Sequence, residues 1–241
     1  MIRIGALILA FAALVSPSAS ADQTPRAVVE LYTSQGCSSC PPADARLTEL
    51  SRKPDFVALT LHVDYWDYLG WKDTLAKPEF SERQRAYSHS RGDRGVYTPQ
   101  MIVNGAYACV GSDDGKIDVS IRNATREHPR LPVPVAVSRE GDVITVDVAR
   151  AAAGASAPGE VWLVTVQSSV TVAIERGENK GREATYVNVV REMTQIGIWD
   201  GRPARFEAKA SDAGDNFVVL LHEADPDGPG PIIGAAKGAG L

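Results

Sequence analysis

The sequence is poor in cysteine, with three among its 241 residues. A small secreted domain held together by disulfides has a larger, even and dispersed set, so this scarcity argues against a disulfide scaffold. Two of the cysteines, Cys37 and Cys40, are separated by only two residues, and Cys109 is left over. A close pair with one odd cysteine indicates redox or metal chemistry.

Positive charge and long apolar runs are also scarce. The chain has 25 Lys and Arg against 30 Asp and Glu, for a net charge of −5. Proteins that bind nucleic acid need a basic surface for the phosphates, so no nucleic-acid partner is expected. A membrane-spanning helix needs roughly 20 apolar residues, and no stretch after residue 21 is that long. Stable membrane insertion of the mature chain is therefore not expected.

The first residues have the pattern of a cleaved export signal. Arg3 precedes an apolar run from Ala6 to Val15, which is too short to span a bilayer. Ala19-Ser20-Ala21 follows, and this small-x-small pattern is what signal peptidase accepts. We predict a signal peptide over residues 1–21 and a periplasmic or secreted mature protein. A buried N-terminal helix and a retained anchor are the alternatives.

The first half of the mature chain alternates strand-like and helix-like segments. A strand, a helix and a second strand in succession are typical of a parallel sheet. The later Asn104-Gly105 pair favours a tight type I′ hairpin turn, because both residues adopt positive φ readily. The expected elements are a strand at 27–32, a helix at 41–52, a strand at 56–63, a helix at 78–90, a hairpin at 100–110 and a helix capped by Ser112 or Asp113.

The pattern changes after the proline-rich stretch Pro129–Pro134. Short strand-like segments with regular turn signals follow, which is typical of an antiparallel sandwich or barrel-like sheet. We therefore predict an α/β domain over 22–130, followed by a mainly antiparallel β domain over 131–241. The expected strands of the second domain are 135–138, 143–149, 160–167, 185–192, 205–208, 217–223 and 232–236.

The setting of Cys37 and Cys40 favours reactivity. The pair follows a predicted strand directly and precedes Pro41 and Pro42, which the first turn of a helix tolerates. Free N–H groups and the macrodipole at a helix start stabilise negative charge. The thiolate is the reactive form of cysteine. We therefore expect this position to increase the fraction of Cys37 that is present as thiolate at neutral pH.

Thr98-Pro99 is the second candidate part of the site. In this order of elements, the residue before the hairpin faces the dithiol across the end of the sheet. A cis peptide bond there would expose the Thr98 backbone to an extended substrate segment. Roughly 5% of X–Pro bonds are cis, so spacing alone does not decide the isomer.

These residues resemble a known family. The segment Glu30–Asp44 (ELYTSQGCSSCPPAD), with 62–67, 98–100 and 176–179, is similar to secreted bacterial thioredoxin-like proteins without an assigned function. The resemblance implies a thioredoxin fold over about 26–126 and a cis bond between Thr98 and Pro99. It also implies that Cys37 attacks, that Cys40 resolves and that Pro99 shapes a substrate groove. No organic cofactor is implied.

The sequence departs from thioredoxin at two points. The Trp-Cys-Gly-Pro-Cys motif is absent, and the buried aspartate that moves protons in thioredoxin has no counterpart in register. Glu30 is the nearest carboxylate, and we consider it as a proton relay. The alternative is a strand carboxylate with ordinary hydrogen bonds.

Other residues have two interpretations each. Cys109 is expected to be a small buried apolar residue, with pairing to the dithiol or to another molecule as the alternative. The aromatic stretch 65–71 is either a cap over the sheet end or a lip that contacts substrate. The charged segment 176–182 is either a solvated loop or a segment that docks on the first domain. The sequence does not decide between the two interpretations in any of these three cases.

The favoured function is thiol–disulfide exchange in an exported compartment. Cys37 and Cys40 would act on protein or small-molecule disulfides, and another redox protein would be the partner. One alternative is an envelope binding or assembly module whose disulfide is structural. The other is a copper-binding chaperone, in which His62, Asp64 or His89 could add to the sulfur ligands. No metal site is predicted, because the sequence has no second C-x-x-C and no closely spaced His pair.

Overall fold

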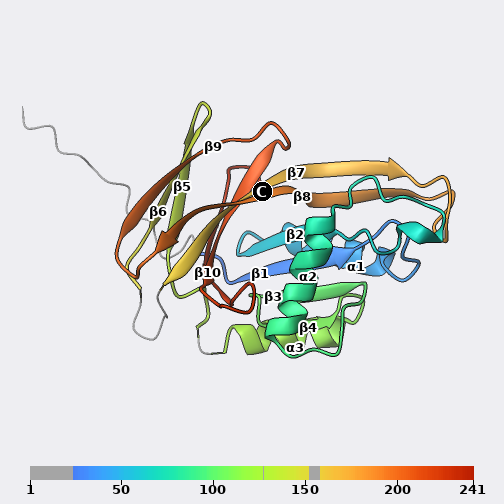
Figure 1. Cartoon of the computed structure of the whole chain (residues 1–241), viewed down its shortest axis with the longest axis horizontal. Coiled ribbons are helices and arrows are strands. Elements are labelled where there is room, and N and C mark those ends of the chain that lie inside the picture. The colour runs from blue at the N-terminus through green and yellow to red at the C-terminus, as the bar shows by residue number, and fades with distance from the viewer. Residues whose placement is uncertain (1–23, 127, 152–157) are drawn as a thin grey trace, which may run out of the picture.

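The computed structural model describes residues 24–126, 128–151 and 158–241 (Figure 1), and the predicted signal peptide lies outside them. Within these residues the chain forms three α-helices and eleven strands. The helices are α1 (Pro41–Ser51), α2 (Pro78–Ser90) and α3 (Asp114–Ala124). The strands are β1 (Ala27–Thr33), β2 (Phe56–His62), β3 (Gln100–Val103), β4 (Tyr107–Val110), β5 (Val135–Glu140), β6 (Val143–Val148), β7 (Gly159–Ala173), β8 (Glu183–Trp199), β9 (Ala204–Lys209), β10 (Asn216–Glu223) and β11 (Ile232–Lys237).

The predicted fold class is wrong. The described residues are mostly β and form a mixed eight-stranded sheet, ordered β11-β10-β7-β8-β2-β1-β3-β4, with a three-stranded sheet, ordered β5-β6-β9. In the large sheet β8 pairs in parallel with β2 through Val189 and Thr60, so both halves of the chain share it. This is not a thioredoxin α/β fold followed by a separate β domain. The boundary after residue 130 stays a prediction, with strands from both sides of it in one sheet.

The two long strands β7 and β8 explain the error. They run for 15 and 17 residues and pair along almost their whole length, whereas the sequence predicts only 160–167 and 185–192. Residues 168–173 alternate between half-buried and exposed positions and include Val170 and Val172, so the strand pattern continues there and the prediction ended the strand too early. The partner strand stabilises these outer segments, and a local hydrophobic pattern carries no information about partners.

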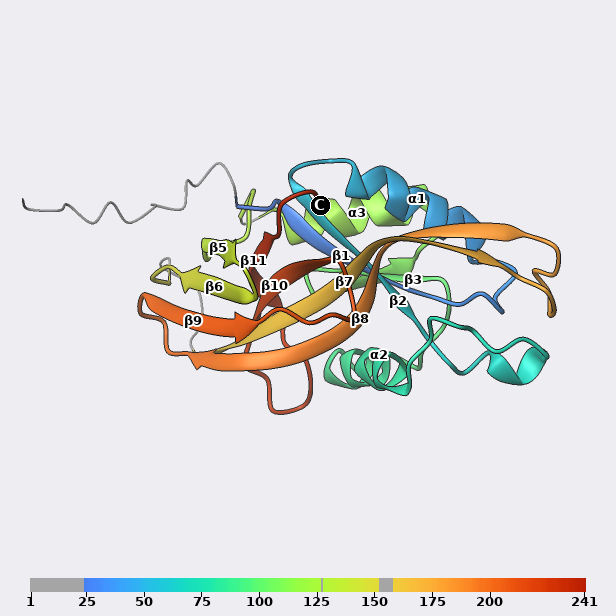
Figure 2. The ribbon, with the colours of Figure 1, turned by 90° about the horizontal axis from the view of Figure 1, so that it is seen from above.

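The helices cover the two faces of the sheet unequally. Helices α1 and α3 lie on one face and α2 lies on the other (Figure 2). Alternate residues of β1 therefore enter different cores. Leu31 packs with Leu47 of α1 and Ile117 of α3, whereas Tyr32 packs with Phe80 of α2. The region around β1 is thus buried on both sides and positions whatever follows it.

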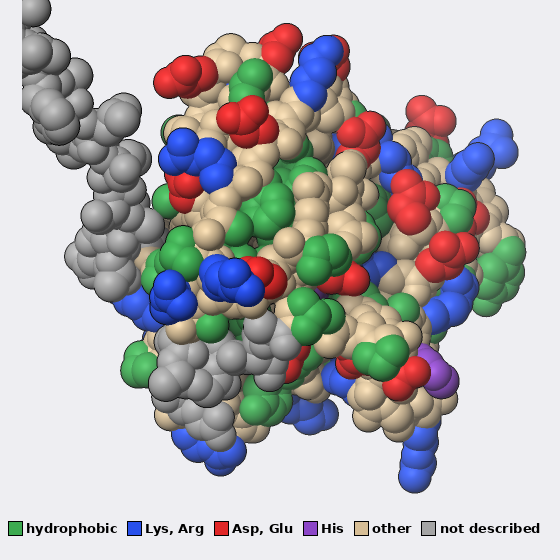
Figure 3. All heavy atoms as spheres, turned by 60° about the vertical axis from the view of Figure 1, so that its left-hand side comes forward, with side chains coloured by type: hydrophobic (Ala, Val, Ile, Leu, Met, Phe, Trp, Pro, Cys, Tyr) green, Lys and Arg blue, Asp and Glu red, His purple; other side chains and the backbone are tan. Residues whose placement is uncertain are grey.

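The three-stranded sheet closes the other end of the molecule. Its side chains, including Ile144 and Val146, pack with Trp199 of β8 and Leu221 of β10 in a third apolar cluster. Figure 3 looks onto this end, where acidic and basic side chains are interspersed with apolar ones. This end is built as a packed β core.

Several local predictions are confirmed. Helix α1 begins with Pro41 and Pro42 in its first two positions, and α2 spans the predicted residues. Asn104 and Gly105 have φ values of 49° and 69°, as a type I′ turn requires. The Asp113 carboxylate caps α3 by accepting a hydrogen bond from the Lys116 N–H. Among the described residues, no helix combines the length and apolar character needed to cross a membrane.

Candidate functional site around the Cys37–Cys40 disulfide

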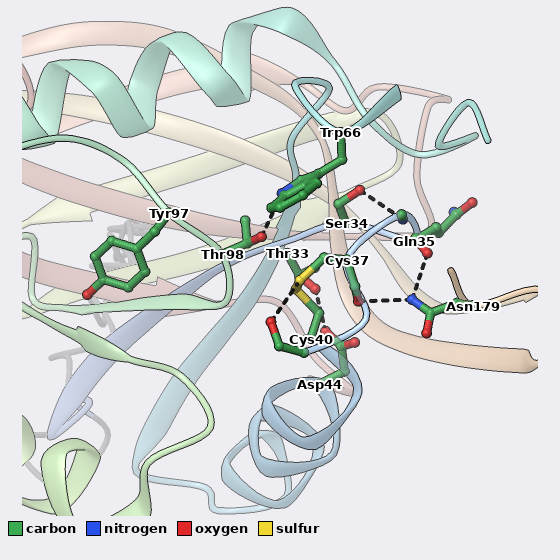
Figure 4. Close-up of a disulfide and its surroundings, with 12 residues drawn as sticks. Thr33, Ser34, Gln35, Cys37, Cys40, Asp44, Trp66, Tyr97, Thr98 and Asn179 are labelled. Carbon is green, nitrogen blue, oxygen red and sulfur yellow. Dashed lines mark hydrogen bonds between the residues drawn. A yellow bond between two sulfur atoms is a disulfide. The ribbon is translucent and has the colours of Figure 1, made fainter. Parts of the chain in front are cut away.

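Cys37 and Cys40 form a disulfide between the end of β1 and the start of α1 (Figure 4). Their Cα atoms are 5.4 Å apart, and Cys40 is the residue that precedes α1. Cys37 is 2% exposed and Cys40 is completely buried. The Cys37 Sγ lies 3.4 Å from the Ser39 Oγ. Of the two sulfur-bearing residues, Cys37 is the one with access to solvent.

The start of α1 offers few N–H groups to a thiolate. Pro41 and Pro42 occupy its first two positions and have no N–H. The next two N–H groups, of Ala43 and Asp44, donate to the Cys40 carbonyl at 2.9 and 3.1 Å. The donors expected from the sequence at this helix start are therefore either missing or already used.

The segment Ser34–Cys40, which we call the dithiol loop, is held by hydrogen bonds that do not involve sulfur. The Cys37 N–H donates to the Ser34 carbonyl at 3.1 Å. The Gln35 N–H donates to the Asp73 carboxylate at 2.7 Å. The Asn179 Nδ2 donates to the carbonyls of both Gln35 and Cys37 at 2.9 Å. Segments far apart in the sequence thus fix the loop.

Asn179 belongs to the turn between β7 and β8. This answers the question that the sequence left open for 176–182, because Asn179 is buried and docks on the dithiol loop (Figure 4). Gly177 in the same turn has a φ of +75°, and a Cβ there would lie 3.1 Å from the Trp71 Cβ. Glycine therefore permits both the turn and the close approach.

The aromatic stretch after β2 also contacts the site. The Trp71 Nε1 donates to the Gln35 Oε1 at 2.8 Å, and the Trp66 Nε1 donates to the Thr98 Oγ1 at 2.7 Å. Tyr68, in contrast, is 78% exposed. A Cβ on Gly36 would lie 3.2 Å from the Trp66 Cβ, so the loop passes close to this tryptophan. The two tryptophans support the dithiol loop and the segment that faces it.

The peptide bond between Thr98 and Pro99 is cis, as the resemblance implies. Thr98 is half-buried and lies near the disulfide in Figure 4. The Pro99 carbonyl accepts a hydrogen bond from the Gly111 N–H at 2.9 Å. Among the described residues, the N–H and carbonyl of Thr98 have no hydrogen-bond partner. The Thr98 backbone is thus free to pair with an extended segment.

A buried histidine–aspartate contact supports the dithiol loop, because Asp73 also accepts the Gln35 N–H. The His62 Nδ1 and the Asp73 Oδ2 are 2.8 Å apart, and both side chains are fully buried. Burial opposes ionisation of Asp73, but the charge and hydrogen bond of His62 and two backbone N–H donors outweigh it and lower the pKa. The His62 Nε2 is buried and has no partner among the described residues.

Asp44 is a second carboxyl group beside the dithiol. It lies on the first turn of α1, and its Oδ1 accepts a hydrogen bond from the Thr33 hydroxyl at 2.8 Å. Desolvation raises the pKa of Asp44 to about 7, against the lowering effects of the Thr33 hydrogen bond and the charge of His62. The side chain keeps some exposure, so its proton can exchange with solvent.

Glu30 lies on the other face of β1. Its Oε1 accepts from the Arg83 Nε at 2.9 Å and its Oε2 accepts from the Tyr87 hydroxyl at 2.7 Å. These partners belong to α2, and no hydrogen bond joins Glu30 to a cysteine. The structure thus brings Cys37, Cys40, Thr98 and Pro99 together and does not bring Glu30 to them; a proton relay at Glu30 stays a prediction.

Cys109 is free and buried on β4, where it packs with Met101 and Ile117. The prediction of a small buried apolar residue is confirmed, and burial raises the pKa of its thiol. His62 is bonded to Asp73, and Asp64 accepts a hydrogen bond from Ser81. In the part of the chain that the structure describes, no three His, Cys, Asp or Glu side chains are grouped to share a metal ion.

A groove lies away from the disulfide, on the α2 side of the sheet. It has a volume of about 650 Å³ and is formed by α2, β7, β8 and residues 225–229. Phe80, Trp162 and Met193 line it together with several carboxylates. None of its lining residues belongs to the dithiol loop, so the groove is not part of the candidate site.

Comparison with known proteins supports the predicted resemblance to a family without an assigned function. Residues 28–222 match the profile of a family described as "protein of unknown function", DUF1223. The chain belongs to the DUF1223 family. No curated protein matches it.

Two solved structures resemble this DUF1223 protein. A structural-genomics crystal structure of a protein from Agrobacterium tumefaciens is 37% identical, covers 90% of this chain and 96% of its own, and has a TM-score of 0.80. HBP35 of Porphyromonas gingivalis is 13% identical, covers 90% of this chain and 75% of its own, and has a TM-score of 0.65. At that identity the second likeness concerns the fold alone.

Sequence reasoning missed two residues of this site. Asp44 is four residues after Cys40, a spacing that places two side chains on one helix face, and this signal is readable in the sequence. Asp73 follows Trp71 and Lys72 in an irregular segment and has no comparable signal. Its role follows only from the contacts with His62 and the dithiol loop.

Proposed function

We propose that this DUF1223 protein is a thiol–disulfide oxidoreductase, exported to the periplasm or secreted, in which Cys37 and Cys40 exchange with disulfides of proteins or small molecules. The observation that carries the proposal is the independence of the dithiol loop from its disulfide. Asp73 and Asn179 hold Gln35 and Cys37 through hydrogen bonds in which neither sulfur atom takes part. The bond can therefore open and close on a fixed frame.

The small size of the closed loop also supports exchange chemistry. Disulfides stabilise mainly by closing loops in the unfolded chain, and the effect grows with loop length. Cys37 and Cys40 are three positions apart, so the bond closes one of the shortest possible loops. A structural role would make poor use of such a bond.

The helix start favours the reducing direction. A dithiol is a strong oxidant when its reduced, thiolate form is stabilised. Here Pro41 and Pro42 remove two N–H donors, and the next two donate to the Cys40 carbonyl. We expect a reduction potential between about −220 and −270 mV, nearer to thioredoxin than to DsbA.

The test is the reduction potential of the mature protein with Cys109→Ser, equilibrated in glutathione and dithiothreitol buffers and quantified by mass spectrometry. A reversible couple between about −120 and −270 mV supports catalysis. A disulfide that stays intact below about −300 mV contradicts it and favours the binding module with a structural bond.

The two cysteines offer a matched control. With Cys40→Ser, the remaining Cys37 thiol is expected to form a mixed disulfide with 5,5′-dithiobis(2-nitrobenzoate). With Cys37→Ser, Cys40 is expected to react much more slowly, because it is completely buried. Equal rates for the two variants would contradict the assignment of Cys37 as the attacking thiol.

A further inference from the structure

The carboxyl group of Asp44, which accepts one hydrogen bond from a side chain, lies beside the disulfide (Figure 4). Cys40 has helical backbone angles, φ −78° and ψ −34°, and Asp44 follows it by four residues. Side chains four residues apart on a helix are neighbours, with Cβ atoms roughly 5–6 Å apart. A carboxylate can bridge such a separation directly or through one water.

Few groups surround the Asp44 carboxyl group, and they come from three strands and one connecting segment. Thr33 of β1 donates the one hydrogen bond to its Oδ1. His62 of β2 attracts its negative charge, and Asp73, which lies between β2 and α2, repels it. Tyr186 of β8 packs edge-on against the His62 ring, 4.4 Å between centroids, and is also within electrostatic range.

We propose that Asp44 donates a proton to the Cys40 sulfur when the Cys37–Cys40 disulfide opens and accepts one when it closes. This inference rests on the proposed function and names the group that handles the proton in it. Thr33 and the His62–Asp73 pair hold and tune the carboxyl group. Its pKa of about 7 allows it to serve in both directions near neutral pH.

The reductive step balances as follows, for a small dithiol as reductant. One thiolate of the reductant attacks the Cys37 Sγ and forms a mixed disulfide, while the bond between Cys37 and Cys40 breaks. The electron pair goes to the Cys40 Sγ, which takes the proton from Asp44. The second thiol of the reductant then loses its proton to solvent, displaces the Cys37 thiolate and becomes part of a cyclic disulfide. Two electrons pass from the reductant to the protein, and Asp44 regains its proton from solvent.

The experiment measures reduction of the oxidised protein, carrying Cys109→Ser, by dithiothreitol between pH 5.5 and 8.5. Each rate is divided by the concentration of dithiothreitol thiolate. In the parent, the normalised rate constant is expected to fall as the pH rises through about 7, because Asp44 loses the proton that it donates. The fall should be on the order of tenfold, which is below the usual contribution of general acid catalysis because a thiolate leaves readily even without a proton.

Three variants test the assignment. Asp44→Asn is expected to lose the inflection and to react on the order of tenfold more slowly at pH 6. Thr33→Val is expected to move the inflection to higher pH, because the Thr33 hydrogen bond lowers the pKa of Asp44. Glu49→Gln, on the exposed side of α1, is expected to keep the parent profile. Thr33→Val keeps the test available if Asp44→Asn does not fold.

Failure of this inference and failure of the proposed function look different. A reversible couple whose pH profile is unchanged by Asp44→Asn overturns the role of Asp44 and leaves the oxidoreductase intact. An inflection that Thr33→Val does not move also overturns it. A disulfide that dithiothreitol cannot open overturns the proposed function itself.

Discussion

An acidic group lies on each face of strand β1: Glu30 belongs to the strand and is completely buried, whereas Asp44 belongs to α1 and is partly exposed. The two groups have different partners. On the α2 face, Glu30 has a guanidinium and a phenol hydroxyl as partners, and Arg83 is also 3.0 Å from the His222 Nε2. On the α1 face, Asp44 has one neutral hydroxyl donor. Because a single neutral donor does not offset desolvation at Asp44, the pKa of that carboxyl group is raised to about 7.

The Glu30 face has the character of a structural pair. Burial, followed by the charge of Arg83, lowers the pKa of His222 to about 4, so His222 stays neutral and adds no second positive charge at neutral pH. The His222 Nδ1 lies 2.8 Å from the Gly230 carbonyl, which fixes the ring. This face links β1, α2 and β10, elements from both halves of the chain.

The largest effect is expected from a substitution that removes the ion pair between Arg83 and Glu30. Arg83→Met should lower the free energy of unfolding by about 3–5 kcal/mol, because it leaves the Glu30 carboxylate buried without its counter-charge. Urea unfolding at pH 7 measures it. Arg85→Met, an exposed position on the same helix, is the control and should change stability by less than about 0.5 kcal/mol. A similar small loss for Arg83→Met would contradict the structural interpretation of this face.

The next effect concerns the hydrogen bonds between the β7–β8 turn and the dithiol loop. Asn179→Ala should cost about 2–3 kcal/mol, because two buried carbonyls of the dithiol loop lose their donor. Urea unfolding of the oxidised protein measures the loss. Lys180→Ala, exposed in the same turn, is the matched control. If both variants have the same stability, the turn does not hold the loop.

A third prediction sharpens the contrast through pH. The pKa of Asp44 in the folded protein, about 7, is above its ordinary value of 3.8. Its contribution to stability is therefore complete below the unfolded pKa and is lost as the pH rises through about 7. Asp44→Asn should equal the parent near pH 4 and exceed it by on the order of 2 kcal/mol at pH 8, a figure reduced for the partial exposure of the side chain.

Thermal and urea unfolding of both oxidised proteins across pH 4–8 measure this difference. Asp73→Asn is the contrasting variant, because the pKa of Asp73 is lowered and its stabilisation is lost as the pH falls. The two variants should therefore diverge from the parent in opposite directions as the pH rises. Parallel curves would show that the two aspartates do not differ.

The smallest expected effect concerns the segment that faces the dithiol. Thr98→Val should cost about 1 kcal/mol, because the Trp66 Nε1 loses its acceptor. The Cys37 reaction with a small disulfide should keep its rate, because the free Thr98 backbone groups remain. A loss of several kcal/mol would show that Trp66 and Thr98 support the fold itself.

Local sequence features account for much of the dithiol end. Short-range patterns predict β1, the prolines that open α1, the type I′ turn at Asn104-Gly105 and the Asp113 cap, because caps and turns depend on neighbours in the chain. The same patterns predict the cysteine pair at the strand–helix junction. The four-residue spacing from Cys40 to Asp44 is also present in the sequence.

Only the tertiary structure decides the rest. Asn179 bonds to Cys37 across 142 positions, and Arg83 bonds to Glu30 across 53. These contacts depend on β8 lying beside β2 and on α2 packing over β1, which no local periodicity encodes. The sequence by itself therefore determines where the cysteine pair lies, at the junction of β1 and α1. The packing of distant strands and helices determines which partners each carboxyl group has, because those partners come from other elements of the fold.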